Sequence, residues 1–255
     1  MAIQREDERV LDSGPVNSEE ARIHAAYAKR QKADARYSWF SPGQLFIVQE
    51  RERRLLALLR HHNVLQLETK KILEIGCGSG YWLREFIKWG ARPENITGVD
   101  LLPDRVEAAK QLCPEAVSIQ CGSAIQLAYP SVTFDLILQS TVFTSILDPN
   151  MKQQIASEML RVVKSDGFIL WYDYHVNNPW NPDVRGVKKR EIAQLFPHCR
   201  ITLQRITLAP PLVRLLAPYS WLGCELLAKI PLLCTHYLGV IRKEDQLLIK
   251  KLHLR

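Results

Sequence analysis

The stretch Ile72-Leu73-Glu74-Ile75-Gly76-Cys77-Gly78-Ser79-Gly80 decides the fold class of this 255-residue chain. Residues that suit a short buried strand are followed at once by glycine at alternate positions. Glycine lets the backbone turn tightly and approach a ligand without a Cβ in the way. A helix expected from Tyr81 would point its free N–H groups and the positive end of its dipole at that ligand. The stretch therefore predicts a strand, a ligand-binding loop and a helix.

Apolar runs alternate with amphipathic segments downstream of this loop. The run 134–138 is apolar apart from Asp135, as expected for a strand covered on both faces. Repeated alternation of this kind predicts an α/β fold, with a Rossmann-like, mostly parallel seven-stranded sheet and helices on both of its faces. The expected strands are 71–75, 95–100, 116–120, 134–138, 168–172, 200–208 and 237–241.

The remaining segments predict three additions to this core, which itself spans 64–255. Residues 1–18 are polar and are expected to form a disordered tail. Residues 19–63 carry helical patterns and predict an N-terminal helical cap. The segment 209–236 is rich in leucine and broken by prolines, and it lies just before the last strand. We expect it to be a helical lid over an apolar pocket, with membrane docking and an oligomer contact as the alternatives.

Composition limits the classes of function. The formal net charge is +7, but the basic residues form no single block, so a generic basic surface is favoured over an acidic partner. The six cysteines include no Cys-x-x-Cys pair and no histidine spaced for zinc, which predicts reduced thiols, no metal site and a cytoplasmic protein. The first ten residues are charged and do not resemble a signal peptide.

Two cofactor classes fit a glycine-rich loop after a strand. A dinucleotide loop needs a third glycine, and none stands near Trp82 and Leu83, where it would fall. Asp100 ends the next strand about 20 residues beyond the loop, where a carboxylate can accept hydrogen bonds from ribose hydroxyls. Asp100 could instead cap the next helix, but Asp104 is better placed for that role.

These residues give the chain a resemblance to a known family. The segment from about 70 to 174 resembles a class I S-adenosylmethionine-dependent methyltransferase, with 74–80 as the first motif and 98–100 as the ribose motif. Ser123 stands where the family often has an acidic residue beside adenine. The resemblance implies that S-adenosylmethionine is the cofactor, held by Glu74, Gly76, Cys77, Gly78, Gly80, Asp100, Leu101, Ser123, Ala124 and Gln139.

The methyl acceptor is expected past the fourth and fifth strands, since these strand ends lie on the ligand-binding edge. His175 is the first choice for a general base because its ordinary pKa is near neutrality, and Asp173 is the second. Either residue could instead be an ordinary hydrogen-bonded residue at a strand end. The expected acceptor contacts are Tyr37, Phe40, Thr141 and Tyr174. The aromatics at 37–40 could shield the cofactor sulfonium or simply pack the N-terminal helices.

The sequence thus predicts methyl transfer to a small molecule, apolar or acidic, on a hydroxyl or carboxylate oxygen. The tetrapeptide Asp/Asn-Pro-Pro-Tyr/Phe of many enzymes that methylate nucleic-acid amino groups is absent, and 139–142 reads Gln-Ser-Thr-Val instead. No nucleic-acid partner is therefore expected. Two alternatives stay open. The acceptor could be lipid-linked or membrane-associated, with peripheral membrane contact, or the chain could be a non-catalytic, cofactor-binding partner subunit.

Overall fold

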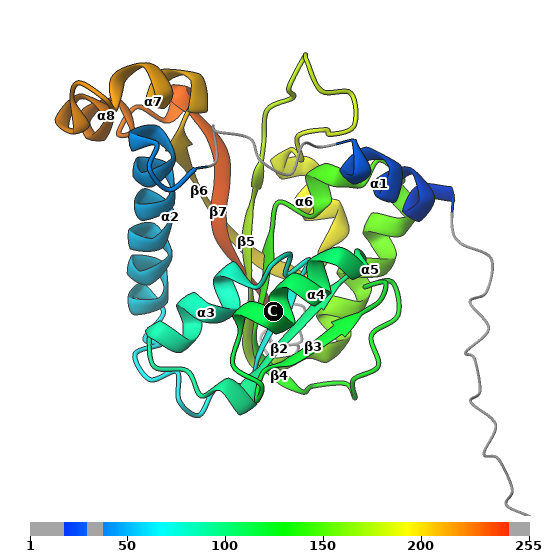
Figure 1. The fold of residues 1–255 in the computed structure, drawn as a ribbon. Coiled ribbons are helices and arrows are strands. Elements are labelled where there is room, and N and C mark those ends of the chain that lie inside the picture. The colour runs from blue at the N-terminus through cyan, green and yellow to red at the C-terminus, as the bar shows by residue number, and fades with distance from the viewer. Residues whose placement is uncertain (1–17, 30–37, 245–255) are drawn as a thin grey trace, which may run out of the picture.

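Seven strands form a single sheet in the computed structural model, which describes residues 18–29 and 38–244 (Figure 1). Their order is β3-β2-β1-β4-β5-β7-β6, and β7 runs antiparallel to both of its neighbours. The predicted Rossmann-like sheet is confirmed. The strands are β1 (Ile72–Ile75), β2 (Ile96–Asp100), β3 (Ser118–Cys121), β4 (Phe134–Ser140), β5 (Val163–Tyr174), β6 (Cys199–Leu208) and β7 (Cys234–Lys243).

Helices cover both faces of the sheet, as the apolar runs of its central strands require. Ile72 and Leu73, adjacent in β1, enter different hydrophobic clusters because successive side chains point to opposite faces. The first cluster is closed by α2 (Pro42–His61), α3 (Tyr81–Lys88) and α4 (Pro103–Leu112). The second is closed by α1 (Ser18–Ala28), α5 (Pro149–Val162) and α6 (Lys189–Leu195).

Two strands, β5 and β7, begin well before their predicted starts. Strand β5 begins at Val163 rather than at 168, because a bulge between Phe134 and Leu136 lets it follow β4 further. Gly167 allows this approach, since a Cβ there would lie 2.7 Å from the Asp135 carbonyl oxygen. Strand β7 begins at Cys234 rather than at 237 because its pairing with β6 extends to Leu208.

The sheet order reverses direction between β1 and β4, and this point positions the candidate site. From β1 the chain proceeds to β2 and β3 on one side, and β4 and β5 lie on the other. A crevice for ligands forms at such a point, outside the carboxyl ends of the strands. We call this side of the sheet the carboxyl edge. In Figure 1 it lies at the top, where β5 ends.

The N-terminal helices are where the sequence placed a helical cap, but they have different partners. Helix α1 is tied to the loop after β4: the Leu147 and Asp148 N–H groups donate to Glu19, and Arg22 donates to the Ser145 carbonyl oxygen. Helix α2 instead packs lengthwise along the sheet, beside β6 and the inserted helices. The tail expected at 1–18 lies almost wholly outside the described residues.

The inserted segment between β6 and β7 forms α7 (Pro210–Leu216), α8 (Trp221–Leu227) and the short 3-10 helix η4 (Pro231–Leu233). Phe46 of α2 meets Trp221 edge-on, with ring centroids 5.6 Å apart. Helices α7 and α8 lie at one corner of the molecule, above α2 (Figure 1). No helix within 18–29 and 38–244 is long and apolar enough to cross a bilayer.

Candidate functional site

The glycine loop after β1 adopts a left-handed backbone at alternate residues. Gly76, Gly78 and Gly80 have φ angles of 68°, 54° and 74°. A Cβ on Gly76 would lie 2.4 Å from the Val142 side chain, whereas a Cβ on Gly78 would meet no atom within 4 Å. Protein packing therefore explains the absence of a side chain at Gly76. At Gly78 the loop instead leaves open space beside the backbone, as a ligand cradle does.

Asp100, at the end of β2, is joined directly to this loop. The Gly78 N–H donates to one carboxylate oxygen at 2.8 Å, and the Leu102 N–H donates to the other at 2.9 Å. Burial raises the pKa of Asp100, which these two hydrogen bonds oppose. Each carboxylate oxygen accepts a further bond. Asp100 thus fits a ligand that presents two neighbouring hydroxyls, such as a ribose.

Glu74 lies at the same edge, in register with Gly98 of β2 and Leu138 of β4. It is 2% exposed, and among the described residues its Oε2 has no hydrogen-bond partner. Burial, and then the neighbouring Asp100, raise the pKa of Glu74 well above its ordinary value. An unsatisfied buried polar atom costs about 1–3 kcal/mol. A ligand that brings a cationic donor, such as an ammonium group, would satisfy it.

The ends of β3 and β4 supply the other expected cofactor residues. Ser123 accepts a long 3.5 Å hydrogen bond from the Ile125 N–H, and Ala124 is buried beside it. Gln139 is fully buried and accepts from the Val142 N–H at 3.3 Å, whereas its Nε2 has no partner in the described chain. Cys77 and Leu101, the remaining expected contacts, pack into the two hydrophobic clusters.

Thr141 follows β4 in a strained conformation. Its φ is 59°, a region that β-branched residues rarely adopt. Its N–H donates to the Tyr172 carbonyl oxygen and its hydroxyl to the Ser140 carbonyl oxygen, at 2.8 and 2.7 Å. Strain of this kind costs about 1–3 kcal/mol and clusters at functional sites. Hydrogen bonds from Thr141 to β4 and β5 therefore hold the start of the loop after β4 in place.

Asp173 and His175, the expected bases, form hydrogen bonds with neighbouring protein groups instead. The Thr144 N–H, the Tyr174 N–H and the Thr144 hydroxyl all donate to the fully buried Asp173. The His175 Nε2 lies 2.9 Å from the Cys234 carbonyl oxygen, and its ring stacks on Tyr237. Both side chains leave the sheet on the face opposite to Tyr172, because strand residues alternate. Neither is placed to act as a base beside Glu74.

Sequence reasoning named Tyr174 as an acceptor contact but did not predict the aromatic cluster to which it belongs on the other face, which comprises Tyr81, Trp82, Tyr172, Tyr174 and His236. The His236 ring lies parallel to Tyr172, with centroids 4.7 Å apart, and 3.7 Å from the Tyr174 centroid. Desolvation, and then the charge of Arg51, lower the pKa of His236 well below its ordinary value. His236 is therefore neutral at pH 7. The pairing of β5 with β7 brings His236 against Tyr172 and Tyr174. Tyr81 and Trp82 come from α3.

Arg51 of α2 faces the aromatic cluster. Its guanidinium carbon lies 4.7 Å from the Trp82 ring centroid, 5.3 Å from Tyr81 and 5.4 Å from Tyr172. Its Nε has no hydrogen-bond partner among the described residues. Of the cations acting on Glu74, Arg51 has the strongest effect. The sequence pattern gave no signal for this role, since 50–53 reads as the solvated polar face of an amphipathic helix.

Of the two aromatic acceptor contacts expected in the segment 37–40, the structure describes only Phe40. Phe40 is 98% exposed, so its side chain is not packed against the site. Its neighbour Trp39 stacks on Tyr81, with ring centroids 5.9 Å apart. Tyr37 lies outside the described residues. The segment thus reaches the aromatic cluster through Trp39 rather than through Phe40.

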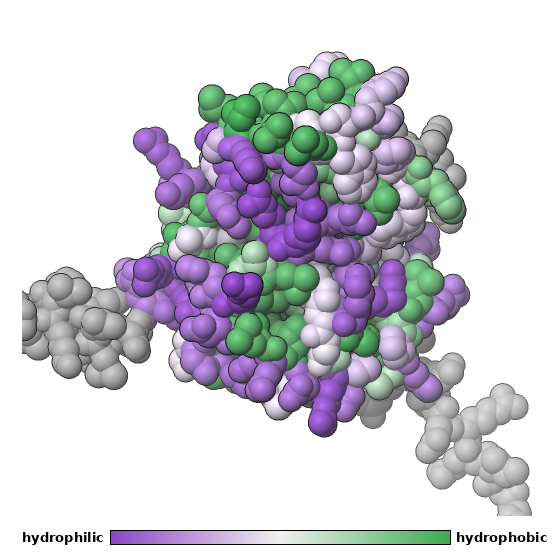
Figure 2. All heavy atoms as spheres, turned by 90° about the vertical axis from the view of Figure 1, so that its left-hand side faces the viewer, coloured by the Kyte–Doolittle hydropathy of each residue, from purple (hydrophilic) through white to green (hydrophobic). Residues whose placement is uncertain are grey.

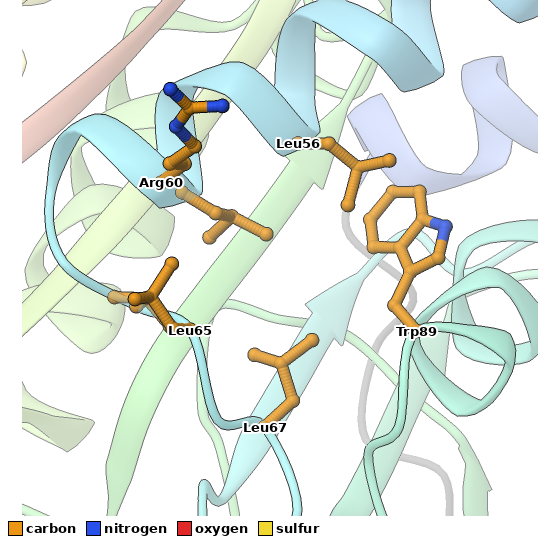
Figure 3. A pocket seen from close by; sticks show the side chains of 7 residues that line it. Leu56, Arg60, Leu65, Leu67 and Trp89 are labelled. Carbon is orange, nitrogen blue, oxygen red and sulfur yellow. The ribbon is translucent and has the colours of Figure 1, made fainter.

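A separate hollow of about 250 Å³ opens at the far end of α2 (Figure 3). It lies near the N-terminal end of β1, away from the carboxyl edge, and none of the site residues line it. Leu56, Leu65, Leu67 and Trp89 point into it, with Arg60 beside them (Figure 3).

Gly78→Ala is expected to weaken cofactor binding at least about tenfold, because its methyl group would enter the open space beside the loop. Gly90 is a matched control, since its φ of 100° is also left-handed and a Cβ there also meets nothing within 4 Å. Gly90→Ala should cost similar stability and leave binding unchanged. Titration calorimetry and thermal melts of both variants test this; equal affinities would show that nothing occupies the space.

The free energy of unfolding should depend on pH through Asp173. Burial raises the pKa of Asp173 to about 7, so the folded protein keeps a proton that the unfolded chain releases. Its contribution is thus complete below about pH 4 and declines as the pH rises to about 7, at about 1.4 kcal/mol per unit. Urea unfolding of wild type and Asp173→Asn across this range should show a shrinking stability difference. A difference that grows with pH would mean that Asp173 is ionised in the folded protein.

Comparison with known proteins gives this arrangement a family. Residues 72–167 match the family described as "Methyltransferase domain". The chain is 31% identical over 107 residues to 2-methyl-6-phytyl-1,4-hydroquinone methyltransferase of Synechocystis, covering 41% of this chain and 32% of that protein. It is 30% identical over 150 residues to norajmaline N-methyltransferase of Rauvolfia serpentina, covering 55% and 49%. The chain therefore spans half or less of these two relatives.

Solved structures agree on the fold. A S-adenosylmethionine-dependent methyltransferase from Archaeoglobus fulgidus superposes with a TM-score of 0.54 at 17% identity, over 78% of this chain and 98% of that one. The match, the sheet order and the glycine loop joined to Asp100 all lie in the same core. Together they show a methyltransferase domain over residues 72–167, on the fold of S-adenosylmethionine-dependent methyltransferases.

Proposed function

We propose that this chain transfers a methyl group from S-adenosylmethionine to a small-molecule acceptor at the carboxyl edge. The observation that carries the proposal is the hydrogen bond between Gly78 and Asp100, which joins an open glycine cradle to a carboxylate that can take two hydroxyls. The bound cofactor supplies an electrophilic methyl group on a sulfonium. The protein contributes by binding, orienting and excluding water, which lowers the barrier by several kcal/mol.

Each end of the cofactor has a fitting partner. Asp100 receives the ribose hydroxyls, while Ser123 and the Ala124 N–H lie toward the adenine. Glu74 receives the ammonium of the methionine part, which supports its charged form against the effect of burial. Arg51 receives the methionine carboxylate, for which a guanidinium is the preferred partner. These assignments satisfy two of the orphaned atoms of the site, Glu74 Oε2 and Arg51 Nε.

The aromatic cluster suits a planar or apolar acceptor with a hydroxyl group. His236 is neutral and its Nδ1 lies 2.9 Å from the Thr235 hydroxyl, so its Nε2 is the atom that can take a proton from the acceptor. A proton acceptor is needed only when the methylated atom must lose a proton, as a hydroxyl oxygen does. The names of two relatives, a hydroquinone and an alkaloid methyltransferase, support an acceptor with a ring system.

The test is transfer of an isotopically labelled methyl group. The folded chain is incubated with labelled S-adenosylmethionine and fractionated small-molecule extracts, and we expect label in an organic-soluble product. Transfer to protein or nucleic acid instead would contradict the proposed acceptor class. Tight cofactor binding with no transfer to any fraction would favour the non-catalytic partner subunit.

A further inference from the structure

The inserted helices pack some of their apolar side chains on the rest of the molecule and expose others. Their inner face packs on Phe46 and Leu208 through Val213, Ala217, Cys224 and Ala228. The outer face carries Leu215 (65% exposed), Tyr219 (87%), Leu222 (71%), Leu226 (55%), Ile230 (45%) and Leu232 (84%). We call these six residues the insertion face.

Leu212, Leu216, Trp221, Leu227 and Leu233 also pack against this inner cluster, so the six outer residues are apolar side chains beyond those that the fold covers. Burying a leucine side chain is worth about 1.5–3 kcal/mol, so leaving several in water is unfavourable. Figure 2 shows hydrophobic residues gathered at the top of the face that carries α2, α7 and α8, above a hydrophilic band. A contiguous apolar patch rimmed by polar residues marks an interaction surface. The insertion face is therefore an apolar surface that is open to an outside partner.

The charges of the segment indicate which partner. Arg214 and Lys229 are its basic residues, and its one acidic residue, Glu225, pairs with Arg53 of α2. The segment thus presents leucines beside the exposed Lys229 and the half-buried Arg214, on a chain with a formal net charge of +7. Apolar side chains with basic neighbours suit an interface of acyl chains and anionic headgroups. Tyr219 adds an aromatic ring with a polar tip, which favours the same interface.

We propose that the insertion face docks on the surface of an anionic phospholipid bilayer. The leucines enter the boundary between headgroups and acyl chains, while Arg214 and Lys229 contact the phosphates. Docking needs no conformational change, because the side chains are already exposed. It does not depend on the proposed function.

The position of the insertion face gives docking a consequence for catalysis. The segment leads directly into β7. Near the start of β7, His236 pairs with Tyr174 at the end of β5. The bilayer would therefore lie beside the carboxyl edge, close to the aromatic cluster. If the methyltransferase proposal holds, the acceptor is an apolar molecule drawn from the bilayer. This last step rests on the proposed function, whereas docking can be measured without cofactor.

The experiment is co-sedimentation of the full chain with phosphatidylcholine vesicles, with and without phosphatidylserine. We expect binding to the vesicles that contain phosphatidylserine, weakened by salt because surface charges are screened. The variant Leu222→Glu/Leu226→Glu should lose at least about tenfold in binding. Binding that is absent, or equal for both vesicle types, would overturn the proposal.

A matched control separates apolar docking from a change of net charge. Leu65→Glu/Leu112→Glu introduces the same two charges at leucines that are 72% and 55% exposed, against 71% and 55% for Leu222 and Leu226. The control should bind vesicles as wild type does, and thermal melts report on folding of both variants. An equal loss in both would overturn the proposal. So would a wild-type dimer, seen by sedimentation velocity without vesicles, that Leu222→Glu/Leu226→Glu converts to monomer.

Discussion

Replacing Asp100 by alanine is expected to lower the affinity for S-adenosylmethionine about a hundredfold. A hydrogen bond to a charged group contributes about 1.5–3 kcal/mol, and the carboxylate is assigned two from the ribose. The same carboxylate accepts the N–H groups of Gly78 and Leu102. Its removal therefore also loosens the glycine loop. Titration calorimetry of the two proteins measures the affinity difference directly.

Asp100→Asn separates the two parts of this effect. Asparagine keeps one acceptor oxygen but turns an N–H₂ group toward one of the two backbone donors. We expect an affinity loss of about tenfold and a smaller loss of thermal stability than in Asp100→Ala. If Asp100→Ala binds cofactor as tightly as wild type, the ribose assignment is wrong and Asp100 only shapes the loop.

The second large effect is expected from Arg51→Met. Methionine keeps most of the apolar stem but removes the charge assigned to the methionine carboxylate of the cofactor. Loss of one charge-assisted hydrogen bond corresponds to about a ten- to hundredfold loss of affinity. The variant also leaves Glu74 without its strongest favourable charge. Cofactor affinity of the variant, measured by calorimetry, checks this result.

Arg53→Met is the matched control for Arg51→Met. Arg53 lies on the same helix with its side chain 54% exposed, and it pairs with Glu225 instead of facing the aromatic cluster. The control should bind cofactor as wild type does, since an exposed ion pair contributes little. Unchanged cofactor affinity in Arg51→Met, with a raised KM for the acceptor, would move Arg51 to the acceptor side of the site.

The sequence was sufficient to predict those parts of the fold and of the candidate site that depend on local backbone conformation and on strand ends. Alternate glycines after an apolar strand require a left-handed loop, and the structure has one at 76–80. Asp100 was predictable because the next strand ends at the same edge of a parallel sheet. The insertion was also predictable as a segment, because prolines break its pattern between two strands.

What the sequence could not supply depends on packing between distant segments. Asp173 and His175 point to the face opposite to Tyr172, and sequence position alone does not say which face of the sheet the ligand meets. Arg51 and His236 meet only because α2 and β7 both pack beside Tyr172. The insertion was expected to cover a pocket with its leucines. Some of its leucines, such as Leu212 and Leu227, do pack inward around Phe46, but Leu215, Leu222, Leu226 and Leu232 stay exposed.

The central claim is that the cradle at Gly78 and the carboxylate of Asp100 together bind S-adenosylmethionine. Isothermal titration of the folded chain with S-adenosylmethionine tests it most directly, with a thermal melt of the same sample to establish that it is folded. We predict saturable binding at one site per chain, weakened about a hundredfold in Asp100→Ala. A folded wild-type sample that shows no saturable binding would contradict the account.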